Sequence, residues 1–387
     1  MASTTPKSIR TSGLIFDTAV KELGVTGLDH VTFTSIARAA GLTTGAMYSR
    51  FENSAELLVG LWEERLRPAL TYFLDCYFAA VNDQTNIKAL EELCRLIADP
   101  SQELLLAAEA ISVAPRIDEL FEVISPEVAE LLKVEPKLEA VHFGVLTVIL
   151  GSLMYFPFSS AKKFIPTVVE NGVRVGRVTN VKNYGPVSNA DIQTFEADDV
   201  SSDPLIRDLL VATRTVIAKS GFERATVSRI ARKWGHNSAT IYQYFENKSE
   251  LMASVVELAL RNSLIIRQSE PSPEEYIDSG AQTISNHLSD ERRPYLRFRL
   301  EAHVAALHNQ NVADVMRVEY SRYRDRMLAN TSLPRGITTA ASEGANAAYI
   351  GRAMLFPYAP ECGNYDWRPY SDASVTALLN IYSLSVG

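Results

Sequence analysis

The chain has few of the residues that build disulfide frameworks and metal sites. Its 387 residues include only three cysteines, Cys76, Cys94 and Cys362, which lie far apart and form no CxxC pair. The six histidines have no spacing that would bring several of them to one metal ion. We therefore expect no disulfide framework, no metal and no cofactor, and the cysteine usage fits a reducing cytoplasm.

Catalytic motifs are also missing. The sequence contains no P-loop, no GxSxG nucleophile elbow and no HExxH zinc motif. His303 and His308, five residues apart, do not share a helix face well. We therefore expect that the protein is not an enzyme.

Neither a leader nor a membrane span is expected. The N-terminal segment MASTTPKSIRTSG has no apolar core of the kind a signal peptide needs. The most apolar stretch, residues 141–158, contains His142, Ser152 and Pro157 and is at the lower length limit for a span. We expect a buried helix there, no membrane partner and a cytoplasmic location.

The overall charge is acidic. The formal net charge is −8 and the isoelectric point is about 5.4, which does not by itself suggest a nucleic-acid partner. Net charge describes the whole surface, however, and a basic patch can lie on an acidic protein. Because 47% of the residues are hydrophobic, the chain can build two substantial cores.

An internal repeat divides the chain in two. The ten residues TFTSIARAAG from Thr32 align with TVSRIARKWG from Thr226, and the register continues without a gap to Tyr48 and Tyr242. A weaker echo follows downstream, where GSLMYFPF at 151–158 resembles GRAMLFPY at 351–358. We interpret this as duplication of a whole domain.

The segment between the copies is rich in turn-forming residues. Residues 159–203 contain Asn-Gly at 171–172 and Gly-Pro at 185–186, which are linker signals. The β-branched residues around Asn171 allow a short hairpin over residues 167–178. Elsewhere the apolar residues recur at helical spacing, so the rest of the chain is predicted to be nearly all helix.

Each copy contains a pattern of short helices. Thr226 is a plausible N-cap and Gly235 allows a sharp turn between two helices, here residues 227–234 and 238–244. Asn247, with Glu250 in the capping-box position, then begins a longer helix. Helix-turn-helix geometry of this kind places the start of the last short helix against base edges in the major groove.

These residues resemble the TetR family of bacterial repressors. The family pattern is Thr, Ile/Val-Ala, Gly, Tyr-x-x-Phe and Asn/Ser-Lys-x-x-Leu. The second copy has Thr226, Ile230-Ala231, Gly235, Tyr242-Gln-Tyr-Phe245 and Asn247-Lys248-Ser-Glu-Leu251. The first copy has Thr32, Ile36-Ala37, Gly41, Tyr48-Ser-Arg-Phe51 and Asn53-Ser54-Ala-Glu-Leu57.

The resemblance implies an all-α fold of two TetR-like units. Each unit would have an N-terminal three-helix domain with a helix-turn-helix, followed by a helical domain for ligand binding or dimerisation. The expected boundaries are residues 1–60 and 61–160 for the first unit, 161–203 for the linker, and 204–254 and 255–387 for the second unit.

The resemblance also implies which residues contact double-stranded operator DNA. Those expected at phosphates are Thr32, Tyr48, Arg50, Thr226, Tyr242, Tyr244 and Lys248. Those expected to read bases are Thr43, Thr44, Gly45 and Ala46 in the first module and Asn237, Ser238, Ala239 and Thr240 in the second. Because the two sets differ, we expect two unlike half-sites.

The two modules also differ in charge. Residues 205–267 carry ten Lys/Arg and five Asp/Glu, whereas the aligned residues 11–73 carry five and seven. Ser54 stands in the first copy where the family has Lys. Phosphate neutralisation supplies much of the affinity for DNA, so we expect the second module to anchor the protein.

TetR-like proteins usually form homodimers through their C-terminal domains, and here both copies lie on one chain. We predict an intramolecular pseudo-dimer in which residues 138–156 pack against 337–356, with Gly144, Gly151, Gly344 and Gly351 permitting close approach. The last apolar helix, residues 373–386, has no good counterpart in the first copy. Further dimerisation of the whole chain remains open.

A pocket for a small apolar effector would fit the family. Six residues are candidates for its lining, either aromatic or polar within apolar runs: Tyr77, Glu109, His142, Phe298, Glu301 and His303. Aromatic residues at this spacing are more often core than pocket lining, and each polar residue is equally consistent with a satisfied buried polar group or a surface residue. The predicted function is a sequence-specific DNA-binding transcriptional regulator, a repressor released by an effector. The alternative is a regulator whose first module has lost DNA binding or binds another protein.

Overall fold

The computed structural model describes residues 6–184, 203–262, 273–329 and 333–384. Within these ranges every regular element is helical, which confirms the predicted all-α fold. The first copy forms α1 (Pro6–Thr26), α2 (Phe33–Ala39), α3 (Thr44–Tyr48), α4 (Ser54–Leu61), α5 (Arg67–Asn82), α6 (Ile87–Ala98), α7 (Gln102–Val113), α8 (Asp118–Leu132), α9 (Glu139–Tyr155) and α10 (Ile165–Gly176). A π-helical turn, Trp62–Leu66, joins α4 to α5.

The second copy follows a similar order, with one helix fewer among the described residues. It forms α11 (Pro204–Ser220), α12 (Val227–Trp234), α13 (Ser238–Ile241), α14 (Lys248–Asn262), α15 (Pro273–Leu288), α16 (Arg293–His308), α17 (Gln310–Ala329), α18 (Arg335–Leu355) and α19 (Arg368–Leu384). Each copy begins with a long helix and two short ones, and each ends with a long buried helix followed by one more.

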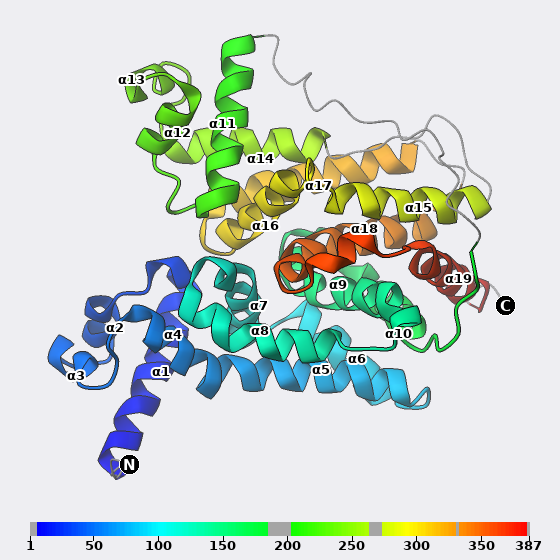
Figure 1. The fold of residues 1–387 in the computed structure, drawn as a ribbon, viewed down its shortest axis with the longest axis horizontal. Helices are drawn as coiled ribbons and strands as arrows, with labels where there is room; N and C mark the ends of the chain where they lie inside the picture. Colours follow the sequence, from blue (N-terminus) through cyan, green and yellow to red (C-terminus); the bar gives the residue numbers. More distant parts are fainter. Residues whose placement is uncertain (1–5, 185–202, 263–272, 330–332, 385–387) are drawn as a thin grey trace.

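The two copies lie one above the other around a shared centre (Figure 1). The segments α1–α3 and α11–α13 both project from the left side of the body, below and above its middle. The remaining helices form the body, with α9 and α18 near its centre. Buried side chains of both copies join in one hydrophobic cluster, so the copies share a core.

The closest contact between the copies is that of α9 with α18. At Gly151 a Cβ atom would lie 2.0 Å from the Ala347 carbonyl oxygen, and at Gly351 it would lie 1.9 Å from the Thr147 carbonyl oxygen. Only glycine therefore allows the two backbones to cross here. A Cβ at Gly344 would meet nothing nearer than 3.7 Å, so that glycine is not needed for close approach.

The segment predicted as a linker contains a helix, and the predicted hairpin at residues 167–178 is wrong. Ile165, Val168, Val169 and Val173 recur at helical spacing and are all buried, forming one face of α10. The Asn-Gly pair at 171–172 lies inside this helix, where Gly172 packs against Ile149. Burial of the apolar face outweighs the local preference of Asn-Gly for a turn.

This helix is also the missing counterpart of the last one. α10 follows α9 as α19 follows α18, and α10 packs against α19. The expectation that the first copy lacks such an element is therefore wrong. Part of the expected linker, residues 185–202, lies outside the described residues.

One segment, Pro136–Phe158, is long and apolar enough to cross a membrane by length and composition. Of its most apolar window, 89% is buried inside the structure. It includes α9, which contacts α18, α10 and α19, as the predicted core helix would.

Candidate DNA interface

The first module turns sharply between α2 and α3. The Thr32 hydroxyl accepts the Ser35 N–H at 3.1 Å to begin α2, and the Thr43 hydroxyl accepts the Ala46 N–H at 3.2 Å to begin α3. Gly41 lies between the helices with φ of 66°, a conformation that favours glycine. The sequence thus directs the start of α3 away from the body.

The inner side of this module is apolar and carries one exposed tyrosine on its rim. Ile36, Met47 and Phe51 are buried. The Phe33 ring meets the Tyr48 ring edge to face, with centroids 4.9 Å apart. Tyr48 nevertheless stays 66% exposed, so Phe33 orients its ring while the side chain faces outward.

The second module has the same construction. The Thr226 hydroxyl accepts the Arg229 N–H at 3.3 Å, and the Asn237 side-chain oxygen accepts the Thr240 N–H at 3.0 Å. Gly235 has φ of 84° between α12 and α13. The predicted cap at Thr226 and the predicted turn at Gly235 are confirmed.

The following helix begins with the predicted capping arrangement in both modules. The Glu250 N–H donates to the Asn247 side-chain oxygen at 2.9 Å, and the Glu250 carboxylate accepts the Glu246 N–H at 2.6 Å. In the first module the Glu56 N–H donates to Asn53 at 2.9 Å. These bonds hold α4 and α14 at a fixed angle to the short helices before them.

The expected base-reading residues gather at the starts of α3 and α13. Figure 1 places both short helices at the outer left of the molecule. The exposed members are Thr43, Thr44, Gly45, Asn237 and Ala239, and the half-buried ones are Ala46, Ser238 and Thr240. Thr43 and Asn237 also cap their helices, so a base contact by either would share its side-chain oxygen with a backbone N–H.

The expected phosphate-binding residues are accessible, with two exceptions. Thr32 and Thr226 are exposed, Tyr242 is 53% exposed and Tyr244 is 36% exposed. Arg50 instead folds back, and its guanidinium donates to the Ala46 carbonyl at 2.9 Å and to the Ser49 hydroxyl at 3.1 Å.

Lys248, expected at a phosphate, is half-buried and bonded within the protein. Its ammonium group donates to the carbonyls of Phe222 at 3.1 Å and Glu223 at 3.2 Å, which joins the start of α14 to the turn after α11. Burial lowers its pKa. Of its three N–H bonds, two are used within the protein, so the Ser54 counterpart removes an internal clamp more than a phosphate contact.

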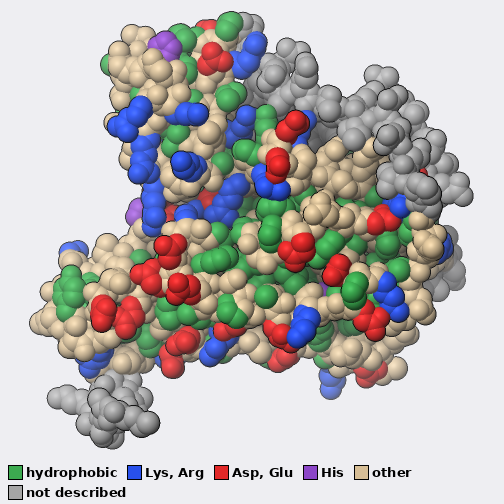
Figure 2. Space-filling model, in the orientation of Figure 1, with side chains coloured by type: hydrophobic (Ala, Val, Ile, Leu, Met, Phe, Trp, Pro, Cys, Tyr) green, Lys and Arg blue, Asp and Glu red, His purple; other side chains and the backbone are tan. Residues whose placement is uncertain are grey.

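The two modules present opposite charges to solvent. Figure 2 shows Lys and Arg side chains gathered over the upper module and acidic side chains over the part of the face below it. The exposed basic residues of the upper module are Lys219, Arg224, Arg229, Arg232 and Lys233. The exposed acidic residues of the lower module include Asp17, Glu52, Glu56, Glu63 and Glu64. The positive field of this face is therefore centred on α11–α13.

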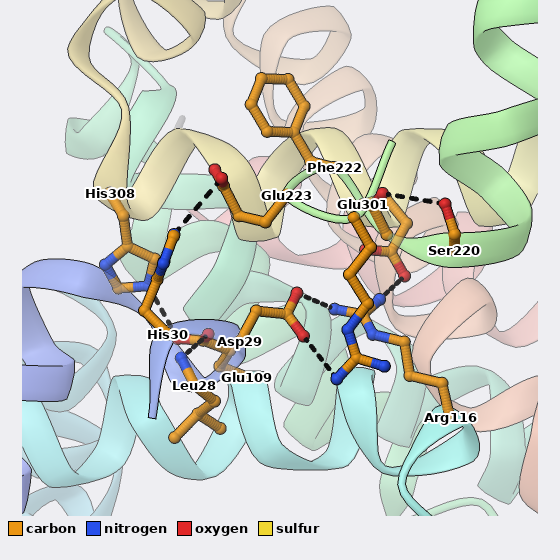
Figure 3. Close-up of polar contacts among 12 residues, drawn as sticks. Leu28, Asp29, His30, Glu109, Arg116, Ser220, Phe222, Glu223, Glu301 and His308 are labelled. Carbon is orange, nitrogen blue, oxygen red and sulfur yellow. Dashed lines mark hydrogen bonds and ion pairs between the residues drawn. The ribbon is translucent and has the colours of Figure 1, made fainter. Parts of the chain in front are cut away.

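The modules touch each other through reciprocal ion pairs that the sequence did not reveal (Figure 3). His30 lies 3.3 Å from Glu223, and Arg224 lies 3.7 Å from Asp29. Since residues 29 and 30 align with 223 and 224 in the repeat, the two contacts are the same pair of positions taken in both directions.

A second reciprocal set lies beneath the first. Glu109 accepts from the Leu28 N–H at 2.7 Å and from His308 at 2.8 Å. Arg116 pairs with Glu301 and, at 2.5 Å, with Asp29. Figure 3 shows Arg116 between these two carboxylates. Burial alone would lower the pKa of Arg116, but the two carboxylates outweigh it and raise that pKa.

The six predicted pocket residues do not meet at one cavity. Glu109 and Glu301 belong to the ion-pair network, and His303 bonds the Arg299 carbonyl at 2.7 Å and the Tyr320 hydroxyl at 3.0 Å. Tyr77 and Phe298 are core side chains. His142 bonds the Leu131 carbonyl at 2.8 Å at the edge of a shallow depression. A cavity of about 300 Å³ does exist, but none of the six lines it.

Together, the two caps, the glycine turns and the outward recognition helices define a DNA-binding transcription regulator of the helix-turn-helix class. A sequence model of the bacterial regulatory proteins of the tetR family matches residues 15–61 and 209–255, one in each copy. The chain therefore carries two DNA-binding domains of the tetR type in tandem.

Two further comparisons add little. The solved structure of a transcriptional regulator from Rhodococcus sp. Rha1 covers 46% of this chain and 96% of its own, at 20% identity and a TM-score of 0.34. No curated protein matches the chain.

Proposed function

We propose that the protein is a cytoplasmic repressor that binds one operator with both modules and reads two unlike half-sites. The observation that carries this is the placement of α3 and α13 on one side of the molecule, each with an exposed tyrosine beside it. A duplex lying along that side would meet both recognition helices. Thr44 and Gly45 in the first module align with Ser238 and Ala239 in the second. Because these side chains differ, the two modules would prefer different bases.

The contacts between the copies support an intramolecular pseudo-dimer. The pair Glu109–His308 is repeated as Arg116–Glu301 at equivalent positions. The Tyr358 hydroxyl donates to the Ile111 carbonyl at 2.7 Å, and the equivalent pair brings the rings of Phe158 and His303 to 5.8 Å. In a homodimer such reciprocal contacts set the spacing of the two readers. Here one covalent chain would set it.

The charge difference supports unequal contributions from the modules. The basic residues of the α11–α13 segment would neutralise phosphates and release counterions, which strengthens binding. The acidic surface of α1–α4 would repel the duplex, so contact there depends on the second module holding the DNA nearby. A small effector would release the operator by favouring another spacing of the modules.

The test compares Tyr48→Phe with Tyr242→Phe over a range of salt concentrations. Each change removes one hydroxyl and keeps the ring. Loss of a hydrogen bond to a charged phosphate costs about 1.5–3 kcal/mol, so Tyr242→Phe should weaken binding by tenfold or more, and Tyr48→Phe by less. Tyr72→Phe, an exposed tyrosine on α5 away from both modules, is the matched control. Equal losses at every salt concentration would overturn the proposed asymmetry.

The second candidate function is a regulator in which the first module no longer binds DNA and instead contacts a protein. The acidic surface of α1–α4 favours it. If it holds, removing Tyr48 leaves both the affinity and its salt dependence unchanged. A DNA contact by module 1 predicts a measurable loss that shrinks as salt rises.

A further inference from the structure

The second unit contains a cavity of about 300 Å³ that the DNA interface does not use. It lies among α15, α16, α18 and α19, and Val148, Val168 and Asn171 of the first unit reach its wall. Much of its surface is apolar, with Ala340, Ala345 and Leu378 among the lining residues. A cavity of this size is at the small end of those that hold small-molecule ligands.

Two buried guanidinium groups line this cavity. Arg352 is 4% exposed and Arg299 is 5% exposed. Arg299 donates to the Tyr320 hydroxyl at 2.8 Å and to Asn346 at 3.3 Å, and it stacks on the Tyr349 ring at 4.1 Å. These partners are neutral, so they orient Arg299 without balancing its charge.

The guanidinium group of Arg352 has fewer hydrogen-bond partners than that of Arg299. Its buried Nε has no hydrogen-bond partner, and neither arginine has an ion pair within the described part of the chain. Burial lowers the pKa of Arg352, which is the direction expected when no carboxylate offsets desolvation. The buried Nδ1 of His287, on the same wall, also has no partner.

No carboxylate lines the cavity among the described residues. Glu343 lies on α18 too, but Tyr155 and Ser159 hold its carboxylate, with Arg324 at 3.7 Å. It does not line the cavity. Two like charges without a counter-ion in a low-dielectric site are unfavourable, so the site is arranged for a negative charge that arrives from outside.

The first copy shows that the fold does not need these charges. By the repeat, Ser152 stands where the second copy has Arg352, and Ala107 stands where it has Arg299. The Ser152 hydroxyl bonds the Val148 carbonyl at 2.7 Å within its own helix. The same architecture is thus built without guanidinium groups. The two arginines of the second copy therefore have a function that the fold itself does not require.

We propose that this cavity binds a small organic anion, a carboxylate or a phosphate with an apolar body, between Arg352 and Arg299. The anionic end would take the free guanidinium N–H groups and His287, and the apolar body would lie against the alanines and Leu378. This differs from the purely apolar effector that the sequence suggests. Because both copies line the cavity, occupancy can bear on the spacing of the modules, and that regulatory meaning rests on the proposed function.

Binding is tested on the full chain without DNA, by calorimetry and thermal unfolding. The probes are benzoate, phenyl phosphate and the neutral isostere benzamide. The expected result is that at least one anion binds tenfold or more tightly than benzamide and raises the melting temperature. The relative affinities for benzoate and phenyl phosphate show whether the site prefers a carboxylate or a phosphate. If benzamide binds as well as both anions, or none of the three binds, the proposal is overturned.

The decisive variant is Arg352→Met, which keeps the volume and removes the charge. Without ligand it should melt at a higher temperature than the parent, because an unbalanced buried charge is gone, and it should lose anion binding at least tenfold. Arg352→Lys should keep part of the binding. Arg95→Met, at an exposed residue paired with Glu92, is the control. It should leave anion binding unchanged and should not raise the melting temperature. Unchanged anion binding by Arg352→Met would contradict the proposal, and DNA binding is measured separately, so each can fail alone.

Discussion

At the scale of single residues, equivalent positions in the two copies have kept their backbone roles while their side-chain partners have diverged. Gly27 and Gly221 end the first helix of each module with φ of 87° and 81°. A Cβ at Gly27 would meet His308, and one at Gly221 would meet Arg116, which are themselves equivalent positions. The duplication thus preserves geometry, and the chemistry of each contact is free to differ.

The glycines at the α9–α18 crossing give a direct test of packing. Gly151→Ala and Gly351→Ala each place a Cβ within about 2 Å of a backbone oxygen, which neither helix can avoid without moving apart. Overpacking of this kind costs about 1–3 kcal/mol of unfolding free energy. Gly344→Ala, on the same α18 but with only ordinary contacts, should be neutral or stabilise by up to about 1 kcal/mol. Denaturant unfolding measures all three, and equal effects would contradict the described crossing.

The Glu109–His308 contact predicts a pH dependence. Burial lowers the pKa of His308, but the hydrogen bond and charge of Glu109 more than offset this, so its pKa is raised above 6.5. The folded state therefore holds the proton more tightly than the unfolded state. The contribution to stability is fully present below pH 6.5 and is lost as the pH rises through the folded-state pKa.

The measurement is the free energy of unfolding between pH 5.5 and 8.5. The parent protein should lose more stability over this range than His308→Gln, which cannot titrate. His236→Gln, at an exposed histidine of the second module, should follow the parent. The same slope for the parent and His308→Gln would show that this contact is not coupled to protonation.

At the scale of elements, the sequence alone predicts those features that depend on interactions within a few residues. The caps at Thr226 and Asn247 and the turn at Gly235 follow from side-chain hydrogen bonds and φ preferences within a few residues. α10 was misread because its Asn-Gly pair suggests a turn, while the burial of Val168 and Val173 against other helices decides the outcome. That burial depends on packing from distant parts of the chain.

The residues of the candidate sites also divide into those that local sequence predicts and those that depend on distant parts of the chain. The residues expected at DNA lie on short elements whose register the motif fixes, so the exposure of most of them follows from the sequence, whereas the internal bonds of Arg50 and Lys248 do not. Glu109 and Glu301 could be recognised as polar groups in apolar runs, but not their partners 81 to 199 residues away. Arg299 and Arg352 could not be singled out, because arginines in helices usually face solvent.

The basic residues of α12 should determine how strongly DNA affinity depends on salt concentration. Arg232 and Lys233 are exposed on this helix, and Arg38 is the counterpart of Arg232 in α2. The double change Arg232→Ala with Lys233→Ala should weaken DNA binding and reduce the slope of log affinity against log salt by about 2. Arg38→Ala should reduce it by less than Arg232→Ala alone. Equal changes in slope from Arg38→Ala and Arg232→Ala would argue that both modules share the phosphate contacts evenly.

At the scale of the whole molecule, the reciprocal contacts join four parts at one point. Arg116 links Asp29 of the first module to Glu301 of the second unit's body, and Glu109 does the same for the Leu28 N–H and His308. The second module joins the same point through the pairs His30–Glu223 and Arg224–Asp29. A change in the body that moves α7 against α16 would therefore reach the first module directly and the second module through these pairs. Such a junction would provide a physical link between the proposed anion in the body and the spacing of the two modules.

Arg116→Met tests whether this junction holds the copies together. It leaves the buried carboxylate of Glu301 with only Arg297, so the free energy of unfolding should fall by about 3 kcal/mol. Arg95→Met removes an exposed pair with Glu92 and should cost less than about 1 kcal/mol. Chemical denaturation compares the two, and a loss no larger than that of Arg95→Met would remove Arg116 from this role.

In the proposed function, one chain reads one operator with two unlike modules. Selection of bound duplexes from a random pool, followed by footprinting of the enriched sequence, tests it most directly. The expected result is a single protected region with two dissimilar half-sites whose centres are about 10 base pairs, or a multiple of that, apart. It also predicts that Tyr242→Phe weakens protection of both half-sites, whereas Tyr48→Phe affects one. A palindromic site, or protection of a single half-site only, would contradict it.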